Sequence, residues 1–469
     1  MSSAAIDSHS VVVVGAGLAG LYAAKLLQQR FPGVIVLEAT AQPGGRVKQV
    51  HGIAPWPVEA GPQFVHGANS SLMTMLNQMQ CGIKEYPWPD WWYFGKEHRF
   101  VKAPEKDEGV ETTHRLFSEV GSESYPETDI SGEQWLRNKG VSHKVLAIAD
   151  ACYANDFGCS LHQLGLRELI TENQKWDSGD SYLVLDCPLS ALVQHIAKTL
   201  NKQIHCNCPV SRIEHDAKGA VITLYGGRQI RCRHVVVTVP ITVLQRDEIT
   251  FSPPLPQLKQ QAIQRVKMSN AIKVIMMFAQ PFWPDGFFDV VCTDSFIPEF
   301  WVTDPPLTPS HSQRASATTG LQDVDKLHHA QQQQSTPVHC MVGFVAGSRA
   351  EEISKLRQNS VIIQTLSQLD EMFGTRRQRF PATSSFLNAT IVDWSREKHI
   401  HGAYTYPTLH AQVGDRDVLA QPIGTTIFFA GEATHPAINP CMQAAMETGQ
   451  RAAAELLKCQ VGCPTSSKL

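Results

Sequence analysis

The sequence lacks any apolar run that approaches the roughly 20 residues needed to span a membrane. It also lacks an excess of charge of one sign, since 41 lysines and arginines against 44 aspartates and glutamates leave a net charge of −3. This balance gives no reason to expect nucleic acid or a membrane surface as a partner. The first ten residues have neither the basic region nor the cleavage pattern of a signal peptide. These absences favour a soluble globular protein, and 469 residues predict two or more domains.

Paired metal-binding spacing is missing as well. The twelve cysteines are scattered, and Cys206 with Cys208 and Cys459 with Cys463 are isolated pairs. We therefore expect no metal site, and we expect reduced, mostly buried thiols of an intracellular protein rather than disulfides.

A dinucleotide-binding pattern stands close to the N-terminus. Four consecutive valines at 11–14 are typical of a strand that is buried on both faces of a parallel sheet. Three glycines follow: Gly15 allows a tight turn, Gly17 a close approach of the backbone to a pyrophosphate, and Gly20 close packing of a helix on the strand. Residues 21–27 predict that helix, whose N-terminal amides would hold the phosphates.

A second predicted strand, 34–37, ends at Glu38, about 20 residues after the glycines, where a carboxylate suits the two hydroxyls of a ribose. Gly44, Gly45 and Arg46 follow shortly afterwards. The two glycines permit another close backbone approach, and the guanidinium of Arg46 can pair with a pyrophosphate. This segment favours FAD over NAD as the dinucleotide.

From here onward the sequence resembles the flavin-containing amine oxidase family, which includes monoamine oxidases, polyamine oxidases and histone lysine demethylases. Residues 58–67 continue the family pattern, with Phe64 in the place of a tryptophan. The resemblance implies that Gln63 and Phe64 contact FAD through their backbone and that His66 lies beside the substrate channel. It also implies that the backbone of Val210 touches the adenine.

Lys273 lies within residues 270–283, a predicted strand of β-branched and apolar side chains that ends in a Phe-Trp pair. A lysine in such a strand must reach solvent at a sheet edge, be paired, or have a function. The resemblance implies a function, in which the ammonium acts through a water molecule on N5 of the flavin. Burial should lower the pKa of this lysine.

The last motif cluster lies near the C-terminus. The resemblance implies that Trp394 packs near the flavin, that Tyr404 forms one wall of the aromatic cage in front of it, and that Glu432 accepts a hydrogen bond from a ribityl hydroxyl. A helix over 442–453 would direct its N-terminus toward the pyrimidine edge of the flavin. Cys441 stands where monoamine oxidases carry a tyrosine, so the cage should be one-sided.

We therefore expect an α/β fold with a FAD-binding, Rossmann-like (doubly wound) domain and a second, mixed-sheet α+β substrate domain. The resemblance spans nearly the whole chain except residues 303–337, a Pro-, Ser-, Thr- and Gln-rich stretch that predicts a flexible insertion. The expected FAD-binding segments are 1–75, 196–250 and 396–469 with the C-terminal tail, and the expected substrate-domain segments are 76–195 and 251–395. The expected cofactor contacts are Gly15, Ala16, Gly17, Gly20, Glu38, Gly45, Arg46, Gln63, Phe64, Val210, Trp394, Gly431, Glu432, Cys441 and Met442.

Two further stretches concern the substrate and the location. Between residues 101 and 135, nine acidic side chains outnumber three basic ones. This excess indicates either a solvated face or a negative mouth that attracts polycations. The chain ends with Ser467-Lys468-Leu469, the tripeptide that the peroxisomal import receptor reads, so we expect a peroxisomal protein.

The resemblance favours a FAD-dependent polyamine oxidase that converts spermine, spermidine or their acetylated forms with O2 into an aldehyde, an amine and hydrogen peroxide. FAD would accept the hydride, Lys273 would position a water, and Tyr404 would pack against the carbon that is oxidised. His66 would recognise an amine or adjust its protonation. Three alternatives stay open: oxidation of another amine, an amino acid or a carotenoid-like hydrocarbon; a nicotinamide-linked dehydrogenase; and a non-catalytic flavoprotein. The dehydrogenase would leave Arg46 and Glu432 without a role.

Overall fold

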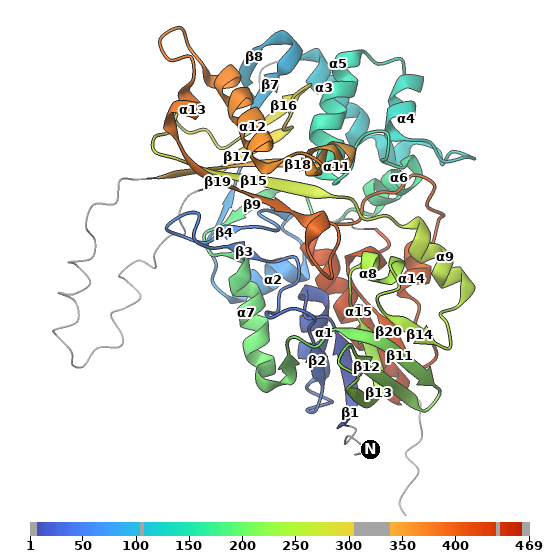
Figure 1. Ribbon diagram of the computed structural model, residues 1–469. Helices are drawn as coiled ribbons and strands as arrows, with labels where there is room; N and C mark the ends of the chain where they lie inside the picture. Colours follow the sequence, from blue (N-terminus) through green and yellow to red (C-terminus); the bar gives the residue numbers. More distant parts are fainter. Residues whose placement is uncertain (1–6, 104–106, 304–337, 438–440, 462–469) are drawn as a thin grey trace, which may run out of the picture.

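The computed structural model describes residues 7–103, 107–303, 338–437 and 441–461. Two large β-sheets organise the molecule, one in the lower half and the other in the upper half of Figure 1. Helices pack against both sheets, which confirms the expected α/β fold with two sheet-based parts. The C-terminal tripeptide and residues 304–337 of the predicted insertion lie outside the described residues.

The lower sheet has eight strands in the order β10-β2-β1-β13-β12-β11-β14, and β20 pairs with β13 beside this path. β1 pairs in parallel with both β2 and β13, as the valine run predicts for a buried parallel strand. The strands are β1 (Asp7–Val14), β2 (Ile35–Leu37), β10 (Ile204–His205), β11 (Val210–Asp216), β12 (Gly219–Leu224), β13 (Gln229–Val237), β14 (Thr250–Ser252) and β20 (Ile427–Phe429).

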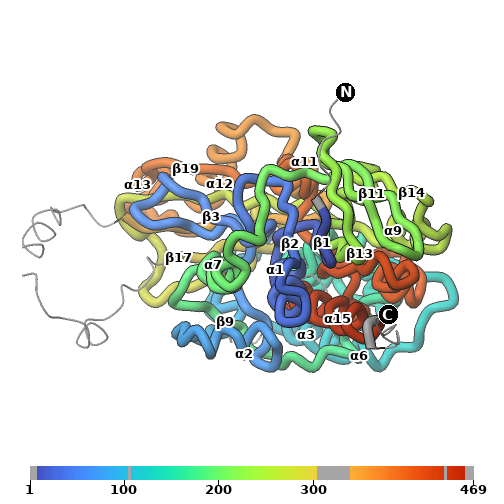
Figure 2. The backbone as a smooth tube through the Cα atoms, turned by 90° about the horizontal axis from the view of Figure 1, so that it is seen from below, coloured from blue at the N-terminus to red at the C-terminus, as the bar shows by residue number. Residues whose placement is uncertain are grey.

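The four valines of β1 serve two separate cores. Val11 and Val13 pack with the apolar side chains of α1 (Leu18–Leu27), α7 (Leu189–Leu200) and α15 (Met442–Val461). Val12 and Val14 point to the opposite face, because successive side chains of a strand alternate. Figure 2 shows α1, α7 and α15 gathered on one side of β1 and β2. Positions 11–14 of the strand each need an apolar residue for this reason.

β13 shares one of its edges between two different strands. Its first half pairs antiparallel with β12, from Gln229 to Cys232, and its second half pairs in parallel with β20, from Val235 to Val237. β11 and β12 form an antiparallel extension of this sheet. The lower sheet is therefore mixed rather than purely parallel.

The upper sheet has seven strands in the order β19-β15-β18-β17-β16-β7-β8. β15, which carries Lys273, lies between β18 and β19, and all eight of its residues are buried. The edge strands are β19 and β8. The strands are β7 (Trp91–Phe94), β8 (Arg99–Lys102), β15 (Ala271–Phe278), β16 (Asp289–Thr293), β17 (Glu299–Thr303), β18 (His339–Ala346) and β19 (Phe386–Asp393).

Two small sheets complete the β-structure. One has the order β5-β9-β6 and the other pairs β3 with β4. The first carries His66 on β5 and Tyr182 on β9, directly across from each other. Their strands are β3 (Gln49–Val50), β4 (Val58–Glu59), β5 (Val65–His66), β6 (Ile83–Glu85) and β9 (Tyr182–Leu185).

Cys81 and Cys187 form a disulfide, so the expectation of free thiols is wrong for this pair. Ile83 of β6 faces Leu185 of β9 in an antiparallel pair. Cys81 precedes Ile83 by two residues and Cys187 follows Leu185 by two, so the register brings them together, with Cα atoms 5.8 Å apart. Because 106 positions separate them in sequence, no local pattern announces the bond. Nine other described cysteines are free.

The remaining helices cover the sheets and line their junction. No described helix is long and apolar enough to cross a membrane. The predicted domain boundaries stay a prediction, and β14 crosses one of them, at residue 250, to pair with β11. The helices are α2 (Ser71–Gln78), α3 (Glu108–Ser118), α4 (Gly132–Asn138), α5 (His143–Ala149), the π-helix η3 (Asp150–Ala154), α6 (Leu166–Lys175), α8 (Ile241–Gln245), α9 (Gln257–Arg265), α11 (Gly347–Ser354), α12 (Gln358–Phe373), α13 (Pro381–Ser385) and α14 (Asp415–Ala420), with 3-10 turns η1 (Gly95–Glu97), η2 (Val120–Ser122), η4 (Asn201–Gln203), η6 (Trp394–Arg396) and η7 (Glu432–Thr434).

Candidate functional site

A cavity of about 1410 Å³ is lined by residues from both halves of the molecule. Its volume exceeds the roughly 300–1000 Å³ of an ordinary small-ligand pocket, so it has room for a dinucleotide and a substrate together. Of the predicted site residues, Ala16 and Gly20 do not line the cavity. The others line it: Gly15, Gly17, Glu38, Gly45, Arg46, Gln63, Phe64, His66, Val210, Lys273, Trp394, Tyr404, Gly431, Glu432, Cys441 and Met442.

The three glycines after β1 differ in what a side chain would meet. Gly15 has φ +106°, a conformation that L side chains rarely adopt. A Cβ on Gly20 would lie 2.0 Å from the carbonyl oxygen of Gly15, so only glycine lets α1 pack this closely. A Cβ on Gly17 would have no protein atom within 4 Å. Gly17 lines the cavity, so its missing side chain leaves open the space that a pyrophosphate needs.

The second glycine turn lies directly against the first. A Cβ on Gly45 would be 3.3 Å from the Cα of Gly17. The N–H of Gly44 donates to the carbonyl oxygen of Ala16 at 2.8 Å. Two backbone segments without side chains therefore meet at the same wall of the cavity, which suits a phosphate group held by amides.

Glu38 follows β2 and is 7% exposed. Its Oε2 accepts a hydrogen bond from the N–H of Ala16 at 2.8 Å, and its Oε1 accepts from the N–H and hydroxyl of Thr40 at 2.9 and 2.7 Å. These donors hold the carboxylate at the cavity wall. A carboxylate accepts about four hydrogen bonds, so capacity remains for a ribose hydroxyl.

Arg46 and Glu432 form an ion pair at the centre of the site. Nη1 of Arg46 is 2.9 Å from Oε1 of Glu432, and the same nitrogen donates to the carbonyl oxygen of Ala403 at 2.7 Å. The hydroxyl of Thr405 donates to Oε2 of Glu432 at 2.5 Å. The sequence had indicated separate roles for the two residues, on the pyrophosphate and on the ribityl chain. In the structure each orients the other.

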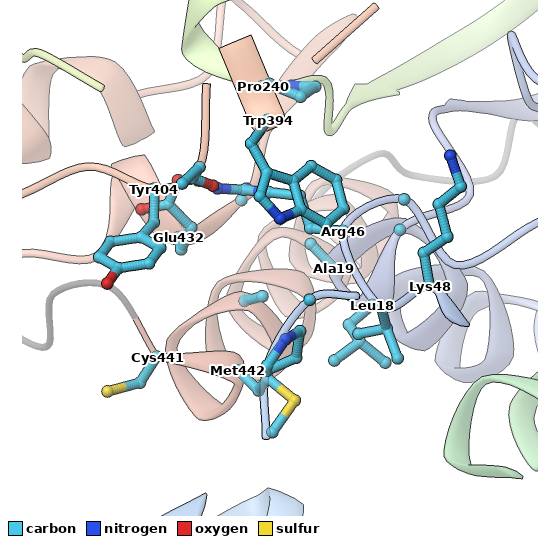
Figure 3. A pocket seen from close by; sticks show the side chains of 18 of the residues that line it. Leu18, Ala19, Arg46, Lys48, Pro240, Trp394, Tyr404, Glu432, Cys441 and Met442 are labelled. Carbon is cyan, nitrogen blue, oxygen red and sulfur yellow. Dashed lines mark hydrogen bonds and ion pairs between the residues drawn. The ribbon is translucent and has the colours of Figure 1, made fainter. Parts of the chain in front are cut away.

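The side chains expected around the flavin gather in one part of the cavity. Figure 3 shows Tyr404 and Cys441 on the same side of the pocket, with Trp394 and Arg46 toward its middle. Nε1 of Trp394 donates to the carbonyl oxygen of Ala60 at 3.1 Å, which fixes the ring at the wall. The same cavity is lined by His114 and Phe117 of α3 and by Leu169 and Glu172 of α6.

Lys273 reaches the cavity from the middle of the upper sheet. Its Nζ donates to the carbonyl oxygen of Glu59 at 3.2 Å and lies 5.1 Å from the ring centroid of Trp301. Because β15 has a neighbour on both sides, the alternative of a lysine that reaches solvent at a sheet edge is wrong. Burial lowers the pKa of Lys273 to about 8, while Glu59 and Glu299 oppose part of that shift.

An aromatic wall that the sequence reasoning missed surrounds His66. The ring of Tyr182 lies 5.1 Å from the His66 ring and stacks on Trp88 at 5.2 Å. Phe64 lies 4.6 Å from Tyr182 and 5.2 Å from Trp301. The density of aromatic residues in 86–94 could have indicated part of this wall. Tyr182 and Trp301 carried no such signal.

Several carboxyl groups at the same cavity were also missed, among them Asp156 and Glu299. Nε1 of Trp88 donates to Oε1 of Glu299 at 3.1 Å. Burial, and then repulsion by Asp156 and Asp289, raises the pKa of Glu299 to about 8. Burial raises the pKa of Asp156 as well, and the nearby His66 opposes that shift. Neither residue belongs to a local pattern that could have indicated it.

The acidic stretch 101–135 places none of its described carboxylates on the cavity wall, and Glu105 lies outside the described residues. Four carboxylates of the stretch lie in ion pairs and Asp129 accepts from the backbone N–H groups of Arg167 and His410. These contacts compensate part of the negative charge, and the attraction of polycations by this stretch stays a prediction. The ion pairs join Asp107 to Arg99 and Lys144, Glu119 to Arg115, Glu123 to Lys139, and Glu133 to Arg137.

Comparison with known proteins gives a consistent result. The family model described as flavin containing amine oxidoreductase matches residues 18–457. Lysine-specific histone demethylase 1B of Mus musculus is 26% identical over 475 residues, which cover 96% of this chain and 53% of that protein. The peroxisomal N(1)-acetyl-spermine/spermidine oxidase of Homo sapiens is 26% identical over 518 residues, which cover 95% of this chain and 94% of that protein. The chain spans about half the length of the demethylase.

Solved structures show the same fold at low identity. Wild-type putrescine oxidase bound to putrescine has a TM-score of 0.78 and 18% identity, over 97% of this chain and 100% of that chain. Cyclohexylamine oxidase from Brevibacterium oxydans has a TM-score of 0.76 and 19% identity, over 97% of this chain and 99% of that chain. At such identities the likeness establishes the arrangement of the chain and not its substrate.

Proposed function

The chain belongs to the flavin-containing amine oxidoreductase family, with FAD as its cofactor, and we propose that it is an oxidase of polyamines such as spermine and spermidine. One observation supports the oxidase activity. Lys273 from the upper sheet and Tyr404 from a C-terminal segment line the same cavity as the Arg46–Glu432 ion pair. A non-catalytic flavoprotein would have no use for a buried lysine at that place.

The residues at the cavity wall fit FAD. The open space at Gly17 and the amides of two glycine turns suit its pyrophosphate. Glu38 has acceptor capacity for the ribose, and the buried side-chain oxygen of Gln63 has no hydrogen-bond partner in the described part of the chain. Met442 begins α15, whose N-terminus carries a partial positive charge. When bound, FAD accepts a hydride from the amine substrate and delivers electrons to O2.

The chain's own residues then bind and orient the amine. The ring of Tyr404 is fixed from two sides, because its hydroxyl donates to the carbonyl oxygen of Asp156 at 3.3 Å and Gly158 lies under the ring. A fixed aromatic face packs the carbon that is oxidised. With a pKa of about 8, Lys273 is mostly charged at pH 7 and can hold a water and offer positive charge to reduced oxygen. His66 lies where it can accept a proton from an incoming ammonium.

The size of the cavity supports a polyamine over a monoamine. Side chains of α3 and α6 line it together with Tyr404, and Cys441 occupies less of it than a tyrosine would. A monoamine would leave much of this space unused. A chain with several amino groups can occupy it.

A hydrogen peroxide assay on purified protein tests this proposal. The panel contains spermine, spermidine, their acetylated forms, benzylamine, tyramine and an N-methylated lysine peptide. We expect the highest kcat/KM for a polyamine. A higher value for a monoamine or for the peptide contradicts the polyamine proposal and retains the amine oxidase. No peroxide with any amine at full FAD occupancy would support the non-catalytic flavoprotein instead.

We also propose that the protein is imported into peroxisomes by the receptor that reads Ser467-Lys468-Leu469. The tripeptide lies outside the described residues, so the support comes from the sequence alone. An oxidase that releases hydrogen peroxide suits a compartment that contains catalase.

A further inference from the structure

We infer that Asp156 and Glu299 together bind a second nitrogen of the substrate, and that this nitrogen is a free ammonium rather than an acetamide. The inference rests on the proposed oxidation of polyamines and specifies which form of the substrate the site accepts.

The two carboxyl groups lie close to the cage residue Tyr404. The carbonyl oxygen of Asp156 accepts the hydrogen bond from the Tyr404 hydroxyl at 3.3 Å. Asn155, the preceding residue, donates from Nδ2 to Oε2 of Glu299 at 3.5 Å. One short segment therefore contacts both the aromatic cage and Glu299 on β17. Both Asp156 and Glu299 line the cavity.

Other buried acids of this protein have strong protein donors, and Asp156 does not. Asp370 accepts from the N–H groups of Ala382 and Thr383 and from the Thr383 hydroxyl. Glu168 is held by the guanidinium of Arg416 at 2.7 Å. The carboxylate of Asp156 has no hydrogen-bond donor among the described residues, and no ion pair joins Asp156 or Glu299 to a basic side chain there. A cavity-facing carboxylate without a donor is matched to a ligand that donates.

The electrostatics favour a charged ligand over a neutral one. Repulsion between Asp156 and Glu299 contributes to the raised pKa of Glu299, so a cation between them removes an unfavourable interaction. Lys273 and His66 also face this region, but the ammonium of Lys273 is directed to the carbonyl oxygen of Glu59. An ammonium has three donors and a charge, whereas an acetamide has one N–H and no charge.

The aromatic wall adds to this preference. Trp88 donates its ring N–H to Glu299 and stacks on Tyr182, so apolar rings border the carboxyl pair. Apolar surroundings strengthen the attraction between an ammonium and a carboxylate, because the effective dielectric constant is low.

The test compares Asp156→Asn and Glu299→Gln with the wild-type protein on three substrates: spermidine, N-acetylated spermidine and butylamine. We expect the wild-type protein to prefer spermidine over spermidine that is acetylated on the nitrogen bound by Asp156 and Glu299. Each variant should lose about tenfold to a hundredfold in kcat/KM for spermidine, mainly through KM, with little change for butylamine. The matched control is Glu119→Gln, an exposed carboxylate of the acidic stretch that does not line the cavity.

Two outcomes overturn the inference while the proposed function stands: a wild-type preference for the acetylated substrate, or an equal loss for spermidine and butylamine in the variants. Absence of any amine oxidation contradicts the proposed function itself. FAD content and Tm report whether each variant folds. If Glu299→Gln does not fold, the Asp156→Asn result decides, because the Asp156 carboxylate accepts no hydrogen bond from any residue that the structure describes.

Discussion

Arg46 and Glu432 are 386 positions apart in the sequence, yet Nη1 of Arg46 lies 2.9 Å from Oε1 of Glu432. The pair joins the loop after β2 to the turn after β20, two of the three segments that the sequence assigns to FAD binding. The Glu432 side chain is 5% exposed, so the guanidinium of Arg46 compensates a carboxylate that is largely removed from water. The ion pair therefore holds together two distant segments of the chain that both line the cofactor site.

Glu432→Gln is expected to weaken FAD binding by about 1–3 kcal/mol, the scale of a lost hydrogen bond to a charged group. The amide keeps the shape of the side chain, and the Thr405 hydroxyl can still donate to it. The FAD dissociation constant, measured by flavin fluorescence, checks the prediction. Glu352→Gln is the control, because Glu352 forms an exposed ion pair with Lys355. An equal effect of the two substitutions would contradict a specific role of Glu432.

Gly17→Ala should weaken FAD binding, whereas Gly20→Ala should lower the stability of the fold. The Gly17 substitution meets no protein atom and has an ordinary φ of −72°, so the Tm of the apoprotein should not change. Its methyl group enters the cavity, and FAD binding should weaken at least about tenfold, or 1.4 kcal/mol. Gly20→Ala places Cβ 2.0 Å from a backbone oxygen and should destabilise the fold by about 1–3 kcal/mol or more. Equal FAD affinity of the Gly17 variant and wild type would refute the pyrophosphate role.

Lys273→Met should slow the reoxidation of reduced flavin by O2 by about a hundredfold, the scale of one lost preorganised charge, with little effect on FAD binding. The pKa of Lys273 is lowered to about 8, so the ammonium predominates below pH 8 and is lost as the pH rises through that value. Reoxidation by the wild-type protein should therefore decline above pH 8, and the variant should lack this decline. Stopped-flow traces between pH 6.5 and 9.5 measure both. Unchanged reoxidation would leave Lys273 with a structural role only.

Cys187→Ser should lower the free energy of unfolding by about 2–4 kcal/mol, because the Cys81–Cys187 disulfide restricts the unfolded chain. Thermal unfolding without reductant measures the effect, and Cys208→Ser, at a free cysteine, is the control. Peptide mapping under non-reducing conditions should recover the two cysteines in one linked fragment. Recovery of both as free thiols would show that the bond does not form in the protein.

Deletion of Ser467-Lys468-Leu469 should leave the amine oxidase activity intact and make a tagged protein cytosolic, since a receptor-read address needs its C-terminal tripeptide. Fluorescence microscopy of the tagged full-length and shortened chains compares their locations. The tag is placed at the N-terminus, so that the C-terminal residues stay accessible. Peroxisomal import of the shortened chain would contradict the role of this tripeptide in import.

Local sequence patterns were sufficient for the first part of the fold. The valine run, the glycine turn and Glu38 lie within one continuous stretch, and their contacts are made inside it: Gly15 N–H to Leu37, and Ala16 N–H to Glu38. Side chains of β1 alternate between two apolar cores, which explains why positions 11–14 all carry valine. Because short-range geometry determines these contacts, the sequence alone predicts them. The family resemblance added the prediction that Lys273 and Tyr404 belong to the same site.

The sequence by itself therefore determined the cofactor, the family and the residues that border one cavity. Only the tertiary structure decided that Asp156 lies beside Glu299, that Cys81 meets Cys187, and that Lys273 lies inside a sheet rather than at its edge. These relationships join segments that are about 70 or more positions apart, the nearest being Lys273 and its β18 partner Phe344. Their geometry depends on strand order and register across whole sheets, and many separate packing interactions set that order. No local pattern of residue types encodes it.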